Sequence, residues 1–340
     1  MNKIQELDIK EFARNFVLSE QLAKSNFLIT GATGLIGSTL IHCLLALEKE
    51  IKIIAPLRNK AKADEIFSED ELQHIRIIEC DIAKYDYNQL SGVDYIVHCA
   101  APTASKFFVE KPVETFDIIY SGTKVLLDYA KDRKVKSFVY LSSLEVYGEI
   151  HDDSKAVTED VQGYLAPLSV RSSYPMAKRA VENLCCLYAT EYGIPVKIAR
   201  LTQTTGAGLA MEDNRVIAQF TRLAANGQDI VLHTTGEAAR PYCYTTDAIS
   251  AILYILLRGN NGDAYNVANE ETYISARAMA EYLRDEFYPN IEVRVELNDN
   301  MGYAPATKLP LSTIKLQELG WRPIVGKKEI FKRLTEYLLS

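Results

Sequence analysis

Tyr174 and Lys178, a tyrosine and a lysine four positions apart, are the residues that most directly suggest chemistry. Residues four apart lie on one face of a helix, so the lysine ammonium can sit beside the phenol and favour its ionised form. An unperturbed phenol titrates near about 10, and the lysine would bring it into the working range of a general base. The pair predicts hydride chemistry on an alcohol. Because an isolated match more often marks a packed tyrosine beside a solvated lysine, other motifs must support it.

A glycine-rich turn separates an apolar segment from an apolar run of helical character near the N-terminus. Gly31 would make the tight turn, Gly34 would let backbone N–H groups approach a pyrophosphate, and Gly37 would let the helix pack on the sheet. We therefore expect a nicotinamide dinucleotide to bind here. The residues expected to contact it are Gly31, Thr33, Gly34, Leu35, Ile36 and Gly37.

Alternating strands and helices must position these residues. The order predicts an α/β fold, a doubly wound parallel sheet of the Rossmann type. Ligands bind such sheets at the carboxyl ends of the strands, where Asp81, Ala100 and Ala101, and Ser143 fall. The expected strands are 26–30, 52–57, 75–79, 95–99, 137–142 and 196–201, and the expected helices are 35–47, 113–132 and 175–192.

The pattern changes near Thr202, where shorter helical and extended pieces begin. They predict a smaller C-terminal α/β lobe that binds substrate. The expected divisions are 1–25, an N-terminal helical extension, 26–201, the dinucleotide-binding domain, and 202–340, mostly the substrate lobe, with the chain free to cross between the lobes. Helices are expected in the last division at 216–225, 246–257 and 275–286.

Composition excludes several classes of protein. The net charge of -7 argues against nucleic acid as a partner, because no basic excess exists to neutralise phosphates. The six cysteines form no Cys-x-x-Cys pair, which indicates reduced residues of a cytoplasmic protein and no metal site. The longest apolar stretch, around 35–47, is too short to span a bilayer, so no membrane association is expected.

The end of the second expected strand determines which dinucleotide binds. A carboxylate there would hold the ribose 2′-hydroxyl of NAD, whereas an arginine accommodates the 2′-phosphate of NADP. Arg58 stands at this place, and no acidic residue does. The sequence therefore favours NADP, while NAD remains open.

The motifs together resemble the extended short-chain dehydrogenase/reductases that act on nucleotide sugars as epimerases, dehydratases and decarboxylases. The resemblance covers nearly the whole chain. It is strongest to the UDP-glucuronate decarboxylases, through the Ala-Pro after His98, the stretch from Pro167 to Tyr174, and Asp213-Asn-Arg-Val216. The other matching stretches are Gly31-Ala-Thr-Gly-Leu-Ile-Gly37, Leu141-Ser-Ser-Leu-Glu-Val-Tyr-Gly148 and Arg240-Pro-Tyr-Cys-Tyr-Thr-Thr-Asp247.

The resemblance implies catalytic roles for four residues. Tyr174 would take the proton from a sugar hydroxyl, commonly at carbon 4, while hydride passes to the nicotinamide. Lys178 would hydrogen-bond the nicotinamide ribose. Ser143 would hold the same hydroxyl as Tyr174, and Glu145 would handle a proton near the distal carbons of the sugar, although a strand-end surface carboxylate is the alternative for Glu145.

The resemblance also implies ligand contacts. Asp81 and Ile82 would flank the adenine, and Ala100 and Ala101 would line the cofactor site. Arg240 would bind the diphosphate of a nucleoside-diphosphate sugar, a use suited to a planar, always-charged fork, unless it forms a surface salt bridge. Arg215 is a further candidate for substrate contact, although Glu212 and Asp213 could pair with it instead. The family commonly forms dimers through its two long helices, so a homodimer is expected.

Two positions depart from the family pattern. Leu144 stands where the 4,6-dehydratases carry an aspartate, and leucine cannot act as an acid, so dehydration is disfavoured. Gln203 stands where many members hold the sugar phosphate with an asparagine, so the substrate contact there differs.

Three functions remain open. The first is a nucleotide-sugar enzyme that oxidises the sugar transiently and returns the hydride, as an epimerase or decarboxylase. The second is an NADP-dependent reductase of a keto-sugar. The third is a non-catalytic protein that senses the dinucleotide, against which the intact Ser143, Tyr174 and Lys178 argue.

Overall fold

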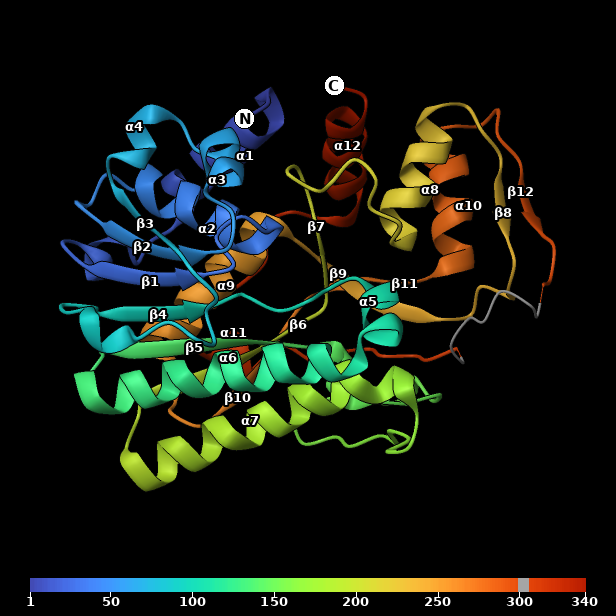
Figure 1. Ribbon diagram of the computed structural model, residues 1–340. Coiled ribbons are helices and arrows are strands. Elements are labelled where there is room, and N and C mark those ends of the chain that lie inside the picture. The colour runs from blue at the N-terminus through green and yellow to red at the C-terminus, as the bar shows by residue number, and fades with distance from the viewer. Residues whose placement is uncertain (299–305) are drawn as a thin grey trace.

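The computed structural model describes residues 1–298 and 306–340 (Figure 1). Its main feature is a parallel sheet with the strand order β10-β6-β5-β4-β1-β2-β3. The predicted doubly wound fold is confirmed, and the six predicted strands occur with ends that differ by at most one residue. The strands are β1 (Asn26–Thr30), β2 (Lys52–Leu57), β3 (Ile75–Glu79), β4 (Tyr95–His98), β5 (Ser137–Ser143), β6 (Val196–Leu201) and β10 (Ala264–Val267).

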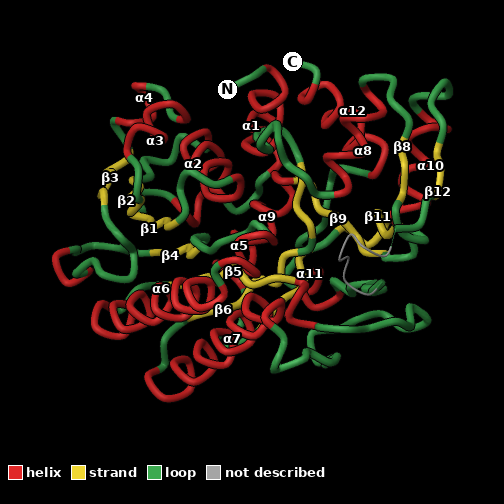
Figure 2. The backbone as a smooth tube through the Cα atoms, turned by 45° about the vertical axis from the view of Figure 1, so that its right-hand side comes forward, coloured by secondary structure: helices red, strands yellow, loops and turns green. Residues whose placement is uncertain are grey.

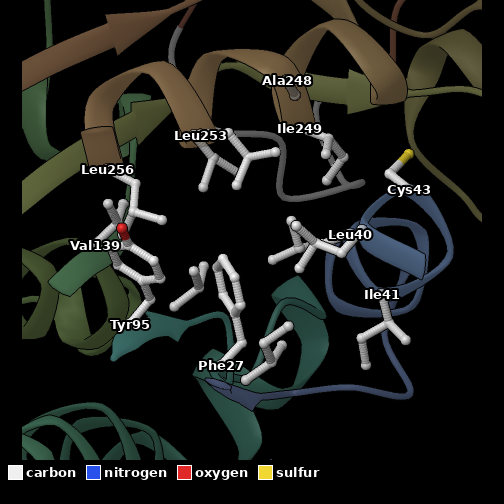
Figure 3. Packing of buried hydrophobic residues seen from close by; sticks show 14 of the residues in the cluster. Phe27, Leu40, Ile41, Cys43, Tyr95, Val139, Ala248, Ile249, Leu253 and Leu256 are labelled. Carbon is white, nitrogen blue, oxygen red and sulfur yellow. The ribbon is translucent and has the colours of Figure 1, made fainter. Parts of the chain in front are cut away.

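The central strands are apolar almost without interruption because helices cover both faces of the sheet. On one face lie α2 (Leu35–Ala46) and α9 (Thr245–Arg258), with α1 (Lys3–Asn15) packed beside them. On the other face lie α6 (Pro112–Arg133) and α7 (Ser173–Tyr192), side by side in Figure 1. Figure 3 shows the first face, where Leu40 and Leu253 from two helices converge over Phe27 of β1.

Short helices and 3-10 turns connect these layers. They fill the loops at both ends of the sheet and carry several of the residues discussed below. They are η1 (Ser19–Leu22), α3 (Lys60–Ile66), α4 (Glu69–Leu72), η2 (Tyr87–Gln89), α5 (Ser105–Glu110), η3 (Leu144–Tyr147), η4 (Val170–Ser172) and α11 (Ile314–Glu318).

Two smaller sheets with their own helices form the region after β6. One has the strand order β11-β9-β7, and the other pairs β12 with β8. Figure 2 shows α8, α10 and α12 gathered beside these strands. The elements are β7 (Gln203–Thr205), α8 (Val216–Ala225), β8 (Ile230–Leu232), β9 (Ala239–Tyr244), β11 (Asn269–Ser275), α10 (Ala276–Glu286), β12 (Val293–Val295) and α12 (Lys327–Leu338).

The chain does not stay in this second region once it has entered it. Helix α9 packs on β5 and β6, and β10 pairs with β6 as the edge strand of the main sheet. The segment 202–340, predicted to be mostly substrate lobe, therefore also supplies one strand and one covering helix to the large sheet. In the part of the chain that the structure describes, no helix is long and apolar enough to cross a membrane.

The N-terminal helix α1 is tied to the C-terminal helix α12 through a buried carboxylate. Asp8 of α1 accepts hydrogen bonds from the Tyr244 hydroxyl at 2.6 Å and from Nη1 of Arg333 at 2.7 Å. Arg333 also contacts Glu11 and Glu329, each at 2.8 Å. The predicted N-terminal helix is thus an integral part of the packed structure, since its removal would leave Arg333 buried with fewer partners.

We predict that Arg333→Met lowers the free energy of unfolding by about 3–5 kcal/mol, because the change leaves Asp8 buried without its cationic partner. Lys328→Met on the same helix is the matched control, since Lys328 pairs with Glu286 at the surface, and its effect should stay within about 0.5 kcal/mol. Denaturant unfolding measures both. Equal effects would show that the Asp8 pair contributes no more than a surface pair.

Candidate active site

The glycine turn between β1 and α2 is shaped by close backbone packing. Gly31 has φ +68°, and a Cβ atom there would lie 2.8 Å from the Ala100 nitrogen. A Cβ atom on Gly37 would lie 2.2 Å from the Gly31 oxygen. Gly34, by contrast, would meet only the Gly31 oxygen at 3.4 Å. The chain itself thus requires glycine at Gly31 and Gly37, whereas at Gly34 the open side is free for a ligand.

Helix α2 begins directly after this turn, with Gly34 as its N-cap and no side-chain hydrogen bond at the cap. The first N–H groups of a helix have no intrahelical partner, so those of Leu35, Ile36 and Gly37 are available to an anion. Thr33 lies in the turn itself. The residues present therefore fit the diphosphate of a dinucleotide.

A buried chain of hydrogen bonds fixes the end of β4 against the end of β1. The His98 ring lies 2.6 Å from the Thr30 hydroxyl and 3.1 Å from the Thr123 hydroxyl. Burial lowers the pKa of His98 to about 3, so the ring is neutral. Thr123 donates to the Ile119 carbonyl, hence it accepts from His98 Nε2–H, and Nδ1 accepts from the Thr30 hydroxyl. Thr30 then accepts from the Ala100 N–H at 3.2 Å, which holds Ala100 over the glycine turn.

The three residues predicted to bind the adenosine end lie after β2 and β3, which are neighbours in the sheet. Arg58 is exposed. Asp81 accepts from the Ala83 N–H and lies 3.7 Å from the Lys84 ammonium. Ile82 lies against α6, since a Cβ atom on Gly122 would approach it to 3.1 Å. The sheet thus brings these side chains to the same edge as the glycine turn.

Tyr174 is the second residue of α7 and is buried. Its ring stacks on Phe108 of α5, with centroids 4.3 Å apart and planes 9° from parallel. Ser143, at the end of β5, interacts with the phenol through its side chain. Burial raises the pKa of Tyr174, the negative charge of Glu145 raises it further, and Ser143 lowers it.

Lys178 lies one turn after Tyr174 on the buried face of α7. Its ammonium donates to the Leu141 carbonyl at 2.7 Å and lies 5.6 Å from the centre of the Tyr174 ring. Burial lowers the pKa of Lys178 to about 7. The expected lowering of the phenol pKa by Lys178 is therefore not what this structure shows. Burial is the largest cause of both pKa shifts, and the Lys178 ammonium donates its hydrogen bond to the Leu141 carbonyl instead of to the phenol.

Glu145 lies in η3, directly after Ser143 and Leu144. Its N–H donates to the Ser143 oxygen at 3.2 Å, and its carboxylate accepts from Arg171 Nη1 at 3.2 Å. Arg171 also lies over the Phe108 ring, 5.3 Å from its centre. Sequence reasoning assigned no role to Arg171 or Phe108. For Arg171 a signal was present, because it stands three residues before Tyr174 and its planar fork matches a carboxylate.

The predicted substrate residues gather around β7 and β9. Gln203 pairs with Tyr242 in the small sheet, and its side-chain oxygen is buried without a hydrogen-bond partner among the described residues. Such an orphaned acceptor needs a donor, which a ligand hydroxyl would supply. Arg240 is on β9, and within 1–298 and 306–340 no carboxylate pairs with it. Its charge is therefore available to an anion.

Arg215 is already engaged by the protein. Its Nε lies 3.0 Å from Asp213 and its Nη1 donates to the Thr204 carbonyl at 2.8 Å. The salt bridge considered as an alternative is thus present, with Asp213 as the partner. Among the described residues, no group of three or more histidine, cysteine or carboxylate side chains could hold a metal ion.

Comparison with known proteins shows which family this site belongs to. The model of the NAD dependent epimerase/dehydratase family matches residues 27–268. The chain belongs to this family. The match begins at β1 and ends after β10, so it includes the glycine turn, Ser143, Tyr174 and Lys178.

The curated relatives bear out the resemblance to UDP-glucuronate decarboxylases. UDP-glucuronic acid decarboxylase 5 of Arabidopsis thaliana is 29% identical over 306 residues, covering 89% of this chain and 86% of the relative. UDP-glucuronic acid decarboxylase 1 of Danio rerio is 27% identical over 346 residues, covering 98% and 78%.

Solved structures with the same fold include UDP-glucose 4-epimerase of Thermotoga maritima, with TM-score 0.78, 23% identity, and coverage of 92% of this chain and 98% of that one. UDP-glucuronic acid 4-epimerase of Bacillus cereus, in complex with UDP-glucuronic acid and NAD, has TM-score 0.75, 21% identity, and coverage of 92% and 99%. At these identities the likeness establishes the fold.

We predict that Gly34→Ala weakens dinucleotide binding at least about tenfold, because the added methyl group occupies the space through which a pyrophosphate approaches. The free energy of unfolding should fall by less than about 1 kcal/mol, since the methyl group meets ordinary contact distances and only the helix cap is altered. Cofactor titration and denaturant unfolding measure the two effects. Gly37→Ala is the contrasting variant and should lower both the dinucleotide affinity and the free energy of unfolding. A Gly34→Ala protein with unchanged affinity would contradict the assignment of the glycine turn as the pyrophosphate site.

Proposed function

We propose that the protein is a nucleotide-sugar enzyme that oxidises carbon 4 of the sugar transiently and then returns the hydride. The observation that carries the proposal is that Ser143, the last residue of β5, interacts with the buried Tyr174 phenol, so that two groups able to hold one hydroxyl lie together at the carboxyl end of that strand. The glycine turn opens at the same edge of the sheet. Membership of the NAD-dependent epimerase/dehydratase family supports the same reading.

In the first step, Tyr174 accepts the proton of the sugar hydroxyl while hydride leaves the same carbon. A bound oxidised nicotinamide dinucleotide supplies the hydride acceptor. Ser143 donates a hydrogen bond to the oxygen that becomes a carbonyl, and such a fixed donor stabilises the charge that develops there. Because the phenol is desolvated, nearby positive charge has to favour its ionised form, and in this structure Arg171 supplies that charge.

In the second step, Glu145 handles a proton at the distal carbons. We favour UDP-glucuronate as the substrate because the curated relatives are named UDP-glucuronic acid decarboxylases. A ketone at carbon 4 lies β to the carboxylate on carbon 5, so carbon dioxide leaves and its bonding electrons form an enolate. Glu145 then directs a proton to carbon 5, hydride returns to carbon 4, and Tyr174 gives its proton back to the oxygen. Leu144 supplies no acid for dehydration.

The diphosphate and the sugar would lie over β7 and β9. Among the described residues, no carboxylate pairs with the Arg240 guanidinium, which matches a diphosphate. The Gln203 oxygen, which has no partner in that part of the chain, would accept a hydrogen bond from a ligand hydroxyl. Arg215, held by Asp213 and the Thr204 carbonyl, would contribute at most its two remaining N–H donors. An epimerase would use the same first step, would keep the carboxylate, and would return hydride to the opposite face of carbon 4.

The cofactor is NAD or NADP. Arg58 at the end of β2 favours the 2′-phosphate of NADP, whereas the UDP-glucuronic acid 4-epimerase neighbour has NAD bound. Arg58 is also the observation that favours the second candidate function, an NADP-dependent keto-sugar reductase that releases its oxidised cofactor. A non-catalytic sensor of the dinucleotide is disfavoured by the intact Ser143, Tyr174 and Lys178.

We further propose that the protein acts in the cytoplasm as a homodimer that pairs α6 and α7 with their copies. Large apolar side chains remain exposed on both helices, including Val113 and Phe116 on α6 and Leu187 and Tyr192 on α7.

The proposed function is tested by incubating the purified protein with UDP-, CDP-, dTDP- and GDP-sugars and following products by mass spectrometry. Loss of carbon dioxide from UDP-glucuronate is the expected result. An isomer of unchanged mass would instead establish an epimerase. Consumption of added NADPH would establish the reductase, and no turnover of any sugar would contradict the proposal.

We predict that Tyr174→Phe lowers kcat by about 10²–10⁴, the usual contribution of a general acid–base group. The affinity for the dinucleotide should change less than about twofold, because only the proton-transferring hydroxyl is removed. Tyr192→Phe, at the exposed end of the same helix, is the control and should keep wild-type turnover. Near-normal turnover by Tyr174→Phe would show that another group is the base.

We predict that Glu145→Gln spares oxidation at carbon 4 but blocks the following step, so that reduced cofactor accumulates during a single turnover. Absorbance of the reduced nicotinamide measures this directly. Glu149 is a half-exposed carboxylate on the same segment. Its variant Glu149→Gln is the control and should accumulate no reduced cofactor. Equal loss of both steps in Glu145→Gln would make Glu145 a structural or binding residue.

A further inference from the structure

Arg171 contacts both halves of the proposed active site although it is not itself placed to react with the sugar. Its Nη1 lies 3.2 Å from the Glu145 carboxylate, and its guanidinium lies 5.3 Å from the centre of the Phe108 ring. Phe108 in turn stacks on Tyr174 at 4.3 Å. The guanidinium and the phenol thus both lie against the Phe108 ring, and the guanidinium also binds the acid of the second step.

Each member of this group is anchored to the backbone around it. The Ser173 hydroxyl, between Arg171 and Tyr174, donates to the Phe108 carbonyl at 3.0 Å, which fixes α5 to the start of α7. The Glu145 N–H is bound to Ser143. Arg171 and Glu145 are therefore held at their relative positions by neighbouring elements, in contrast to a surface pair whose long side chains must be ordered by the pair alone.

We propose that Arg171 is a positioning residue that holds the Glu145 carboxylate and, through Phe108, the Tyr174 phenol in one arrangement, so that the base of the first step and the acid of the second are coupled through it. The inference rests on the proposed function. It adds a role for Arg171, to which sequence reasoning assigned none.

The charges around the phenol give the coupling a measurable consequence. The negative charge of Glu145 opposes ionisation of Tyr174, and the positive charge of Arg171 favours it. With Arg171 present the two charges oppose each other at the phenol, and the effect of Glu145 on the pKa is the larger. Without it, Glu145 acts alone and raises the pKa of the base. A base that ionises at higher pH moves the acidic limb of the rate profile to higher pH.

The experiment measures the single-turnover rate of cofactor reduction by UDP-glucuronate as a function of pH. Arg171→Met, which keeps the side-chain length and removes the charge, should move the acidic limb upward by roughly 0.5–1 pH unit, because both charges are partly exposed and screened. Arg171→Lys should move it less. Lys106→Met is the control, since Lys106 pairs with Glu110 on the exposed face of α5, and it should move nothing.

The double variant Arg171→Met with Glu145→Gln separates positioning from simple structural damage. Removing both opposite charges should return the limb to within about 0.3 pH unit of wild type, although the second step stays blocked. A lower rate at every pH in Arg171→Met with no displacement of the limb would overturn the proposal, as would a double variant that stays displaced.

If no nucleotide sugar leads to reduction of the cofactor in the wild-type protein, the proposed function is contradicted, and the positioning role of Arg171 is not. The positioning role would then be decided by a crystal structure of Arg171→Met. Displacement of both the Glu145 carboxylate and the Phe108 ring would support it, and unchanged positions of the two would overturn it.

Discussion

The exclusion of water from the first turns of α7 is the physical constraint on which the active site depends. Tyr174 and Lys178 are both buried there, and burial disfavours the charged form of each, so the pKa of the phenol rises and that of the ammonium falls to about 7. A phenolate beside an ammonium is the arrangement that the chemistry needs. The surrounding residues therefore have to stabilise the charged forms in place of water. Ser143 and Arg171 do so for the Tyr174 phenolate, and the Leu141 carbonyl does so for the Lys178 ammonium.

The fold provides these groups at one edge of a single sheet. Ser143 ends β5, Ala100 follows β4, and the glycine turn follows β1, which are neighbours in the strand order. The chain then leaves for the second region, returns as α9 and β10, and ends in α12 against α1. Because the last helix is bound to the first through Arg333 and Asp8, the second region is tied to α1, which packs on α2.

Much of this could be predicted from the sequence because its signals are local. Continuous apolar runs predicted six of the seven described strands of the main sheet. The glycine spacing predicted the turn between β1 and α2, because the close packing at Gly31 and Gly37 leaves no room for a side chain. Strand β10 was not predicted, because its four residues pair with β6 only after a long excursion of the chain. Phe108 and Arg171 were missed for the same reason, as their roles arise from contacts between α5, η3 and α7 that no single segment contains.

The expected effect of Lys178 on Tyr174 failed for a reason that sequence spacing cannot reveal. A spacing of four residues places the two side chains on one face of a helix, but it does not determine whether that face is exposed to solvent or buried. Burial raises the pKa of the Tyr174 phenol, whereas a lowered pKa was expected. The Lys178 ammonium donates a hydrogen bond to the Leu141 carbonyl. For Arg215 the sequence already offered a pair with Glu212 or Asp213 as the alternative, and the structure shows the pair with Asp213.

The most direct test of transient oxidation with return of the hydride is isotopic. UDP-glucuronate that carries deuterium at carbon 4 is converted by the protein, and the product is analysed by mass spectrometry and NMR. The account predicts that the deuterium stays at carbon 4 of the product, because the same hydride leaves and returns within one active site. Loss of the deuterium to free reduced cofactor would contradict transient oxidation with return of the hydride, as would a quenched single turnover in which no bound reduced cofactor carries the deuterium.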